Sequence, residues 1–560
     1  MKTVSFVRRK FNAMLGVATV SMAVNFIVML SGSLVAGNFL GKDGLAGINV
    51  CTPVFAVASF LGSLISVGAG LVFSQAMGEF DERRAAGVWS QSAYAALGIG
   101  LFVFLAMTLG GTAFMDFNGV TGAIREEALS YWRWQAVSMG LTPILLLAMA
   151  MVYADGDGTV AMCAGGCYVG GTILFSILFT VLTGHAGGIS GGTALTIAIV
   201  LAVSSLHFRR TNNHLKFIRY FSRRDLLKTV VGSAPDSTIY LCWGLLVLVV
   251  NRFTVARFGE ELLAVVALGV SVVQFSIVFD GVGEALIPLG GMYAGEKNNP
   301  ALRELATHSA LVAAAEGVLV GLVLLAFAPT IATVYGFRGE AARLLPEAVG
   351  VVRSLAFAMP FMGFLMMANT HYLVVGHVKL AVSVTILKDF VLSCSCALAF
   401  GCLLGFRGLW IGMIAGYALA TVYPFAFVAF VHGRDRFPWL VGRDGRSLDF
   451  AIRLDRESLV AARDRIADFL RNGGVGDLIV NRVMYTVEEN GLAALKANGS
   501  RPPCVEYFAS LAKPGFVRLI VRDDGIPQET PFKSFSENRY LNTLNCNRTE
   551  HWFKFAPGRE

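Results

Sequence analysis

The sequence predicts an α-helical integral membrane protein with twelve transmembrane helices in two six-helix repeats, followed by a small C-terminal cytosolic α+β domain. Three observations support this prediction. Hydrophobic residues fill 55% of the 560 positions and charged residues only 15%, against about 25% charged residues in soluble domains. Long apolar stretches recur up to residue 432, and two distant parts of them match each other. After residue 432 the pattern changes to short amphipathic segments.

Apolar stretches long enough to cross a bilayer occur twelve times. A hydrocarbon core of about 30 Å requires about 20 apolar residues per helix. The basic start MKTVSFVRRK precedes an apolar stretch that is too long for a signal-peptide core, so we interpret it as a retained first span. The twelve spans are expected near 12–37, 46–76, 86–113, 129–153, 159–183, 188–207, 229–256, 262–293, 305–328, 350–375, 380–403 and 408–431.

Positive charge predicts the orientation of these spans. The net charge is +8, and the basic residues concentrate at the N-terminus, at 208–228 and in the C-terminal region. Nucleic-acid binding is the competing interpretation, but these clusters flank apolar spans, where positive charge is retained on the cytoplasmic side. We therefore expect a multi-pass plasma-membrane protein with cytoplasmic N- and C-termini, surrounded by lipid, with no nucleic-acid partner.

The cysteines do not predict a metal site or a disulfide framework. Nine cysteines are scattered, and the pairs Cys163/Cys167 and Cys394/Cys396 have no histidine or second pair beside them. Isolated cysteines inside apolar segments usually pack as small hydrophobic residues.

The two halves of the apolar region resemble each other. QAMGEFDERRAAGVWSQSA (75–93) matches MYAGEKNNPALRELATHSA (292–310) at an offset of 217 residues. Pro143 and Pro360 obey the same offset. A duplicated unit of six helices gives both copies the same orientation, related by an axis along the membrane normal. We expect one bundle over 1–215 and a second over 216–432, with a cavity between them.

The segment AGNFLGKDGLAGINVCTPVFAVASFLGSLISVGAGLVFSQAMGEFDERRA (36–85) resembles the opening of multidrug and toxic compound extrusion (MATE) transporters. The segment DGVGEALIPLGGMYAGEKN (280–298) is similar to the corresponding part of the second half. The resemblance covers roughly residues 10–432. It implies twelve helices and the cation-coupled export of organic molecules, with H+ or Na+ as the coupling ion.

Ionisable residues inside a span are costly unless they are paired or hydrated, so each is a functional candidate. Asp280 and Glu284 are the first candidates, because they lie four residues apart on one helix face and two such carboxylates cannot both ionise cheaply. The alternative is that they only keep a vestibule hydrated. Asp236, after Pro235, is expected nearer the cytoplasmic end. Further candidates for the cavity lining or for bonds between helices are Asn251, Gln274, Asn369 and His371, the last also explicable as a buried core residue.

One feature of the MATE family is missing. In one branch of the family an aspartate in the first helix, nine residues before a glycine, carries the coupling ion. Counting back nine from Gly41 gives Gly32, and no acidic residue lies between Lys10 and Lys42. Coupling is therefore expected to depend on the second half.

A charged linker (433–446) precedes the C-terminal segment 447–560, which alternates strand and helix patterns. The pattern is similar to the ATP-binding domain of anti-sigma-factor serine kinases, a histidine-kinase-type ATPase fold. In that family an acid corresponding to Glu489 precedes a magnesium-binding asparagine by four positions, and an Asp-x-Gly-x-Gly turn holds adenine. Here Ala493 replaces the asparagine, and Asp523 and Gly525 are followed by Pro527.

A methyl group cannot bind magnesium, and from Gln528 onward only Gly558 could contribute to a glycine-rich lid over phosphates. We expect a non-catalytic regulatory or docking domain, with a cytosolic protein as its candidate partner. Weak adenine nucleotide binding and an active kinase remain alternatives. No other cofactor is predicted.

The sequence thus predicts a transporter rather than an enzyme: a secondary-active, cation-coupled exporter of small organic compounds working by alternating access. Two alternatives stay open. One is a signalling or receptor protein on a transporter scaffold. The other is a lipid-linked oligosaccharide flippase, which is expected to line its cavity with several cations.

Overall fold

The structure is a computed structural model that describes residues 5–117, 121–210, 213–335, 337–442, 445–499, 501–526 and 537–555. Within helices and strands, the side chains at 21, 23–34, 37–38, 41–47, 49–50, 52–53, 123, 260, 263, 339–341, 537 and 543 lie outside this description. The expectations for Gly32, Gly41, Pro527 and the lid region 528–536 therefore fall outside the described residues.

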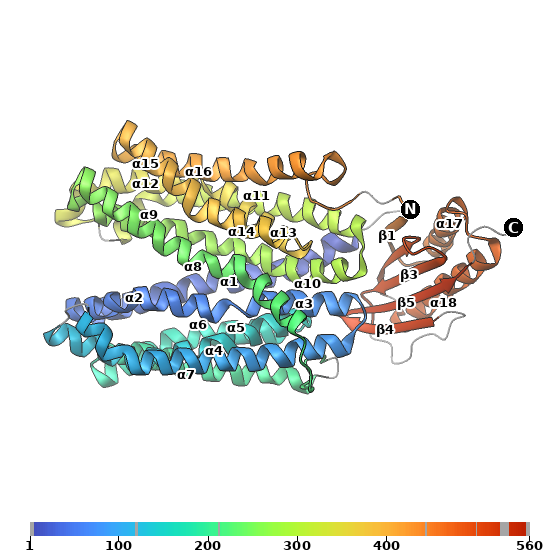
Figure 1. Cartoon of the computed structure of the whole chain (residues 1–560), viewed down its shortest axis with the longest axis horizontal. Helices are drawn as coiled ribbons and strands as arrows, with labels where there is room; N and C mark the ends of the chain where they lie inside the picture. The colour runs from blue at the N-terminus through green and yellow to red at the C-terminus, as the bar shows by residue number, and fades with distance from the viewer. Residues whose placement is uncertain are drawn as a thin grey trace.

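Long helices form a body of two layers, with the C-terminal domain at one end (Figure 1). The first half contains α1 Phe6–Phe39, α2 Gly41–Ser63, α3 Ser66–Gly78, α4 Glu82–Phe117, α5 Gly122–Ala154, α6 Gly158–Thr183 and α7 Gly187–Ser204. The second half contains α8 Arg223–Phe258, α9 Leu263–Val273, α10 Asp280–Glu296, α11 Asn299–Val334, α12 Leu345–Ala356, α13 Met359–Val374, α14 Val378–Ile386, α15 Leu392–Leu404 and α16 Phe406–Phe427. The 3₁₀ segment η3 (Gln274–Phe279) joins α9 to α10, and the π-helical segment η5 (Leu387–Val391) joins α14 to α15.

Among the described residues, ten helices are long and apolar enough to cross a membrane. An eleventh is added if the α12–α13 pair, which is bent by 44°, forms one span. The protein is therefore a multi-pass membrane protein. The first predicted span, 12–37, falls in α1, and most side chains of this span lie outside the description, so the total of twelve stays a prediction.

The C-terminal domain is a two-layer α+β unit. Its antiparallel sheet has the strand order β1-β2-β3-β5-β4, formed by β1 Ser447–Arg453, β2 Cys504–Ser510, β3 Phe516–Asp523, β4 Glu537–Thr543 and β5 Cys546–Lys554. Two helices, α17 Arg456–Asn472 and α18 Asp477–Asn498, cover one face of this sheet.

Local sequence explains how the helical layer forms. Asp455 caps α17, because its side chain accepts a hydrogen bond from the backbone N–H of Ser458 at 2.7 Å. Leu459, Ile466 and Leu470 then follow at helical spacing and pack against alternate residues of the strands. The opposite face of the sheet is turned toward the helical body.

That opposite face contacts the ends of α3 and α10. We call this end of the body, where Gly78 and Glu296 lie, the docking end. Phe508, Ile520 and Leu541 of the sheet belong to one apolar cluster with residues of α3, α4 and α5. The sheet therefore buries its second face against the body.

The turns that follow α3 and α10 have the same conformation at the 217-residue offset. Phe80 and Lys297 both adopt a left-handed backbone, with φ of 57° and 60°. The next residues, Asp81 and Asn298, each cap a helix by accepting from a backbone N–H three residues later, at 2.9 and 3.1 Å. Matching residues therefore form matching turns.

The equivalent glycines of these helices touch each other at the docking end. A Cβ on Gly78 would lie 2.2 Å from the carbonyl oxygen of Met292 and 3.0 Å from the Cα of Gly295. A Cβ on Gly295 would lie 2.3 Å from the carbonyl oxygen of Gln75. Only glycine allows the two backbones to approach this closely. The body is thus closed where α3 meets α10.

Candidate functional site

A cavity of about 290 Å³ lies between helices of both halves. Its lining comes from α1, α3, α5, α6, α8, α10 and α13, with Ser63 at the end of α2 and Ile277 of η3, and most of the lining side chains are apolar. Small-molecule sites are typically largely apolar cavities of roughly 300–1,000 Å³ with a few polar groups. The cavity has the size and character of such a site.

Three carboxylates line this cavity: Asp236, Asp280 and Glu284. Asp236 follows Pro235 inside α8, and Asp280 begins α10, one helical turn before Glu284. The helix changes from 3₁₀ to α-helical winding at Asp280, and 3₁₀ segments within long helices often mark functional hinges. Each of the three side chains is half-buried. The expected pair is thus joined by a third acid from another helix.

Carboxylates that share a largely apolar cavity repel one another unless a proton or a cation offsets their charge. Among the described lining residues, none carries a lysine or arginine side chain. The nearby Lys388 is buried and already paired with Asp389, with Nζ to carboxylate distances of 2.7 and 2.6 Å. The cavity is therefore arranged to attract positive charge.

Of the four other sequence candidates, one lines the cavity and three lie outside its lining as the described residues define it. Asn369 lines the cavity together with its neighbour Thr370. Asn251, Gln274 and His371 lie outside the lining as the described residues define it. The buried ring of His371 contacts the linker instead, with Nε2 2.8 Å from the carbonyl oxygen of Trp439. The linker covers His371 because it folds back over α13.

Several polar residues near the cavity were not singled out from the sequence. Tyr153 and Tyr240 line the cavity, and the Tyr153 hydroxyl donates to the carbonyl oxygen of Met14 at 2.9 Å. Glu316, inside α11, accepts a 3.4 Å hydrogen bond from Thr19 of α1. Glu316 is an ionisable residue in the middle of an apolar helix, and that signal could have identified it.

The nucleotide candidates of the C-terminal domain enclose very little space. A cleft of about 10 Å³, lined by Asn490, Ala494, Asp523 and Asn547 among others, lies between α18 and the sheet. This volume holds about one water molecule. Glu489 lies outside this lining as described, and Gly525 donates its N–H to Asp523 at 2.9 Å.

The side chain of Asp523 is hydrogen-bonded within the domain. Asn547 Nδ2 donates to Asp523 Oδ1 at 2.8 Å and to the carbonyl oxygen of Ile526 at 3.0 Å. Tyr540 in turn donates to the side-chain oxygen of Asn547 at 2.9 Å. Burial also raises the pKa of Asp523. Internal hydrogen bonds thus engage the polar side chains of this cleft.

Comparison with known proteins shows which transporters this chain is similar to. Two curated relatives are the multidrug export protein MepA of Staphylococcus aureus, 24% identical over 252 residues, and MepA of Staphylococcus haemolyticus, 26% identical over 254 residues. Each alignment covers 44% of this chain and 55% of the relative. The chain thus spans about half the length of the curated relatives it matches.

Solved structures share the fold over a larger region. An outward-facing structure of a multidrug resistance MATE family transporter is 20% identical, with a TM-score of 0.71 over 76% of this chain and 97% of that chain. A MOP superfamily transporter from Pyrococcus furiosus has a TM-score of 0.70 at 20% identity, over 76% and 98%. The MatE family model matches residues 17–182 and 239–395, which is more than half of the sequence. The chain therefore belongs to the MatE family.

Proposed function

We propose that the protein is a secondary-active exporter of small organic cations, coupled to H+ or Na+ and working by alternating access between two bundles, 1–215 and 216–432. The observation that carries the proposal is the cavity of about 290 Å³ between the halves, with three carboxylates and no basic side chain among its described lining residues. The export activity of the MepA relatives agrees with it. A flippase for anionic lipid-linked sugars would need the opposite charge.

Coupling follows from competition for the three carboxylates. Asp280 and Glu284 lie one turn apart on α10, and Asp236 faces the same cavity from α8. A proton or sodium ion and an organic cation compete for these acidic groups, so binding of one weakens binding of the other. Exchange of the two across the membrane is antiport.

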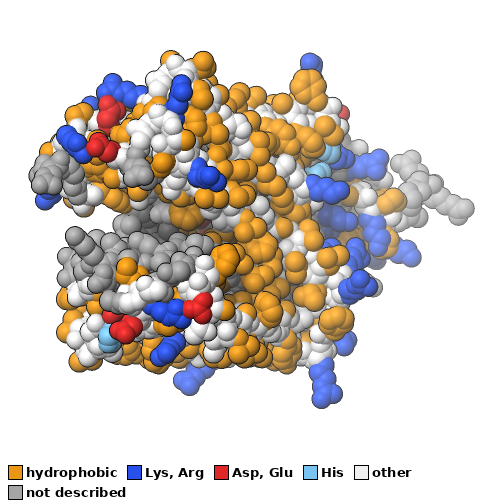
Figure 2. Space-filling model, turned by 60° about the vertical axis from the view of Figure 1, so that its left-hand side comes forward, with side chains coloured by type: hydrophobic (Ala, Val, Ile, Leu, Met, Phe, Trp, Pro, Cys, Tyr) orange, Lys and Arg blue, Asp and Glu red, His pale blue; other side chains and the backbone are white. Residues whose placement is uncertain are grey.

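We infer from the distribution of positive charge that the docking end lies in the cytoplasm. The arginine-rich segment 208–228 includes the connection from α7 and the start of α8, and it lies on the same side as the C-terminal domain. Both termini are then cytoplasmic, and the membrane is the plasma membrane. Figure 2 shows a hollow between the two lobes at the end away from the C-terminal domain. This hollow would open to the outside, as in the outward-facing relative.

The C-terminal domain is proposed to be a non-catalytic regulatory and docking unit, without a bound cofactor. Its nucleotide cleft is closed by internal hydrogen bonds, and its sheet is buried against the body. One observation favours a receptor function on the same scaffold: the C-terminal domain contacts both halves. A rearrangement of the body would therefore change the contacts of this domain.

Ligand binding tests the proposed function. Titration of the purified protein with ethidium, a small aromatic cation, should show saturable binding that Asp280→Asn or Glu284→Gln each weakens about tenfold or more. The matched control is Glu347→Gln, which changes an acid at the start of α12 that pairs with Arg407. Equal binding by all three variants would contradict the assignment of the cavity.

A further inference from the structure

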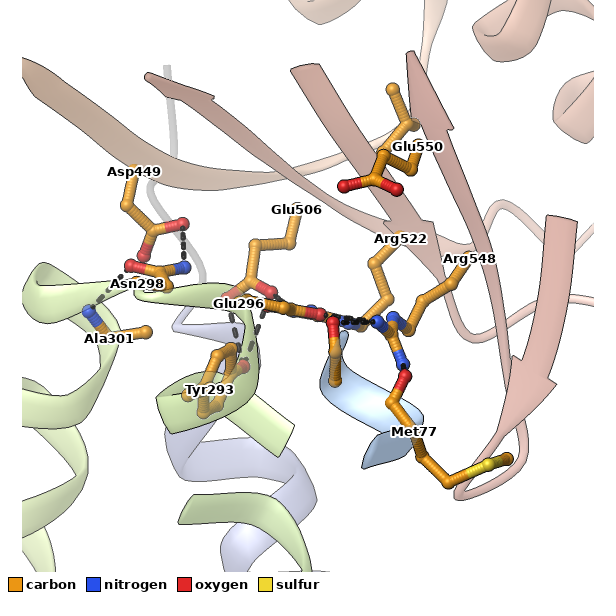
Figure 3. A network of polar contacts seen from close by, with 12 residues as sticks. Met77, Tyr293, Glu296, Asn298, Ala301, Asp449, Glu506, Arg522, Arg548 and Glu550 are labelled. Atoms are coloured by element: carbon orange, nitrogen blue, oxygen red, sulfur yellow. Dashed lines mark hydrogen bonds and ion pairs between the residues drawn. The ribbon is translucent and has the colours of Figure 1, made fainter. Parts of the chain in front are cut away.

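The sheet of the C-terminal domain presents a charged face to the body, and this face is buried. Arg522 of β3 and Arg548 of β5 are exposed by 1% and 0% of their side-chain surface, and Glu296 at the end of α10 by 0%. Figure 3 shows both guanidinium groups directed at this carboxylate. Charged side chains are rarely buried so deeply unless they are paired.

Glu296 is the centre of this network. Its carboxylate accepts from Arg522 Nη2 at 2.5 and 2.7 Å, and Arg548 Nη2 lies 2.9 Å from the same group. Arg518 donates to the backbone carbonyl of Glu296. Three arginines of the sheet thus bind one residue of the second bundle.

Arg548 also binds the first bundle. Its guanidinium donates to the carbonyl oxygens of Met77 at 3.0 Å and Gly78 at 3.2 Å, which are the last residues of α3. It lies 4.1 Å from the centre of the Phe80 ring. One side chain of the C-terminal domain therefore holds the ends of α3 and α10 together, at the point where Gly78 touches Gly295.

Other contacts fasten the domain to both bundles around this point. Tyr293 of α10 donates to Glu506 at 3.1 Å, and Asn298 donates to Asp449 at 3.1 Å. Asn545 donates to the carbonyl oxygen of Gly156, beyond α5, at 3.1 Å. The interface therefore includes parts of both halves, and it cannot keep its geometry if they separate.

The duplicated position in the first half has no such role. Glu79 lies 217 residues before Glu296, but its side chain is 49% exposed and pairs with Arg84 of its own bundle at 2.6 Å. The two glutamates occupy equivalent positions, directly after Gly78 and Gly295 and before turns of the same conformation. Only the second copy has become the anchor of the C-terminal domain.

We propose that the C-terminal domain is a lock that holds the docking end of the two bundles closed, with Arg548 as the bridging residue and Glu296 as its anchor. The body can open at this end only when the sheet leaves it. This proposal rests on alternating access, since an exporter must expose its cavity to the cytoplasm to load substrate. Transport is then controlled by whatever releases the domain.

Two native cysteines report the release. Cys504 and Cys546 have only 1% and 2% of their surface exposed. They lie in a cluster with Phe6 and Ala451, on the sheet face that docks. Burial raises the pKa of the Cys504 thiol to about 11, which keeps it unreactive while the domain is docked. Cys242 and Cys394 are buried inside the helical body and report unfolding instead.

The test compares Glu296→Gln with its matched control Glu79→Gln in the full-length protein. Removing one partner of a buried ion pair leaves the others uncompensated, so Glu296→Gln should speed alkylation of Cys504 and Cys546 by about a hundredfold. Cys242 and Cys394 should stay protected, and Glu79→Gln should behave as the unaltered protein does. Peptide mass spectrometry gives the four rates separately.

A distance measurement tests the lock itself. Spin labels at Glu82→Cys and Asn299→Cys, in a background with the exposed Cys163 and Cys402 changed to serine, lie at the starts of α4 and α11, on different bundles near the docking end. Glu296→Gln should add a longer distance that Glu79→Gln lacks. If Glu296→Gln fails to fold, Arg548→Lys takes its place, because an ammonium group cannot reach both carbonyls and the carboxylate at once.

Two results would overturn the proposal: unchanged alkylation of Cys504 and Cys546, or faster alkylation with a single unchanged distance. Neither readout uses a transported substrate. A protein that shows the lock but no export would refute the proposed function alone.

Discussion

The close contact between α3 and α10 gives a quantitative prediction for Gly78→Ala. The added Cβ would lie 2.2 Å from the carbonyl oxygen of Met292, where an ordinary contact needs about 3.4 Å, so the helices must separate by about 1 Å. Overpacking of this kind costs about 1–3 kcal/mol. We expect a lower thermal unfolding midpoint and, because Arg548 binds the Gly78 carbonyl, faster alkylation of Cys546.

The matched control substitution, Gly98→Ala, should raise the stability of the protein instead of lowering it. Gly98 lies in α4 and is exposed, and a Cβ there would meet no atom within 4 Å. Alanine at this position should therefore stabilise the helix by roughly 0.5–1 kcal/mol. Both unfolding midpoints can be followed by tryptophan fluorescence in the same detergent. The reasoning fails if Gly78→Ala is as stable as Gly98→Ala.

Three further predictions follow from the C-terminal domain and the connector. Burial raises the pKa of Asp449 from 3.8 to about 7, against the opposing effects of Asn298 and Arg522, so docking should weaken as pH rises from about 3.8 toward 7 and level off above it. Thiolate formation by itself speeds Cys504 alkylation as pH rises, so Asp449→Asn should remove only the additional slope over this range. An unchanged slope would exclude Asp449 as its source. Isothermal calorimetry on the full chain should show ATP and ADP binding equally poorly at about millimolar concentration, without magnesium dependence or phosphate release, and tight magnesium-dependent binding would reopen the kinase alternative. A cysteine at Arg219 should resist impermeant thiol reagents added outside intact cells, and labelling there would reverse the orientation.

The helical body was largely predictable because its signals are local. Apolar length marks each span, and an ionisable residue inside a span is conspicuous, which is why Asp236, Asp280 and Glu284 could be named before the cavity was known. The 217-residue offset likewise predicted equivalent positions, and the structure gives Phe80 and Lys297 the same left-handed backbone. These features need only neighbouring residues or a repeated pattern.

The docking interface could not be predicted in the same way. Along β3, Arg518 and Arg522 alternate with apolar residues, and this pattern ordinarily indicates a sheet with one face in water. Arg522 and Arg548 are buried only because the body supplies Glu296 and two helix-end carbonyls, from residues more than 200 positions away. Long-range packing also explains why His371 does not line the cavity as predicted. Its ring is covered by the linker residue Trp439.

The cavity lining was predictable only in part, for a related reason. Asn369 lies on the face of α13 that reaches the cavity, whereas Asn251 and Gln274 lie on helices whose rotation the sequence does not specify. The apolar stripe of a membrane helix shows weakly which face meets lipid, because lipid and protein interior are both apolar. Helix rotation is set by contacts such as the glycine approach of α3 and α10.

The central claim, cation-coupled export through the acidic cavity, is tested most directly by ion flux in proteoliposomes. An outward gradient of ethidium should drive counterflow of H+ or Na+ in the unaltered protein. Asp280→Asn and Glu284→Gln should each abolish this counterflow, whereas Glu347→Gln, outside the cavity lining, should retain it. Substrate-driven flux that persists in both cavity variants would contradict the account. So would the absence of flux from both the unaltered protein and the Glu296→Gln variant, whose docking end is released.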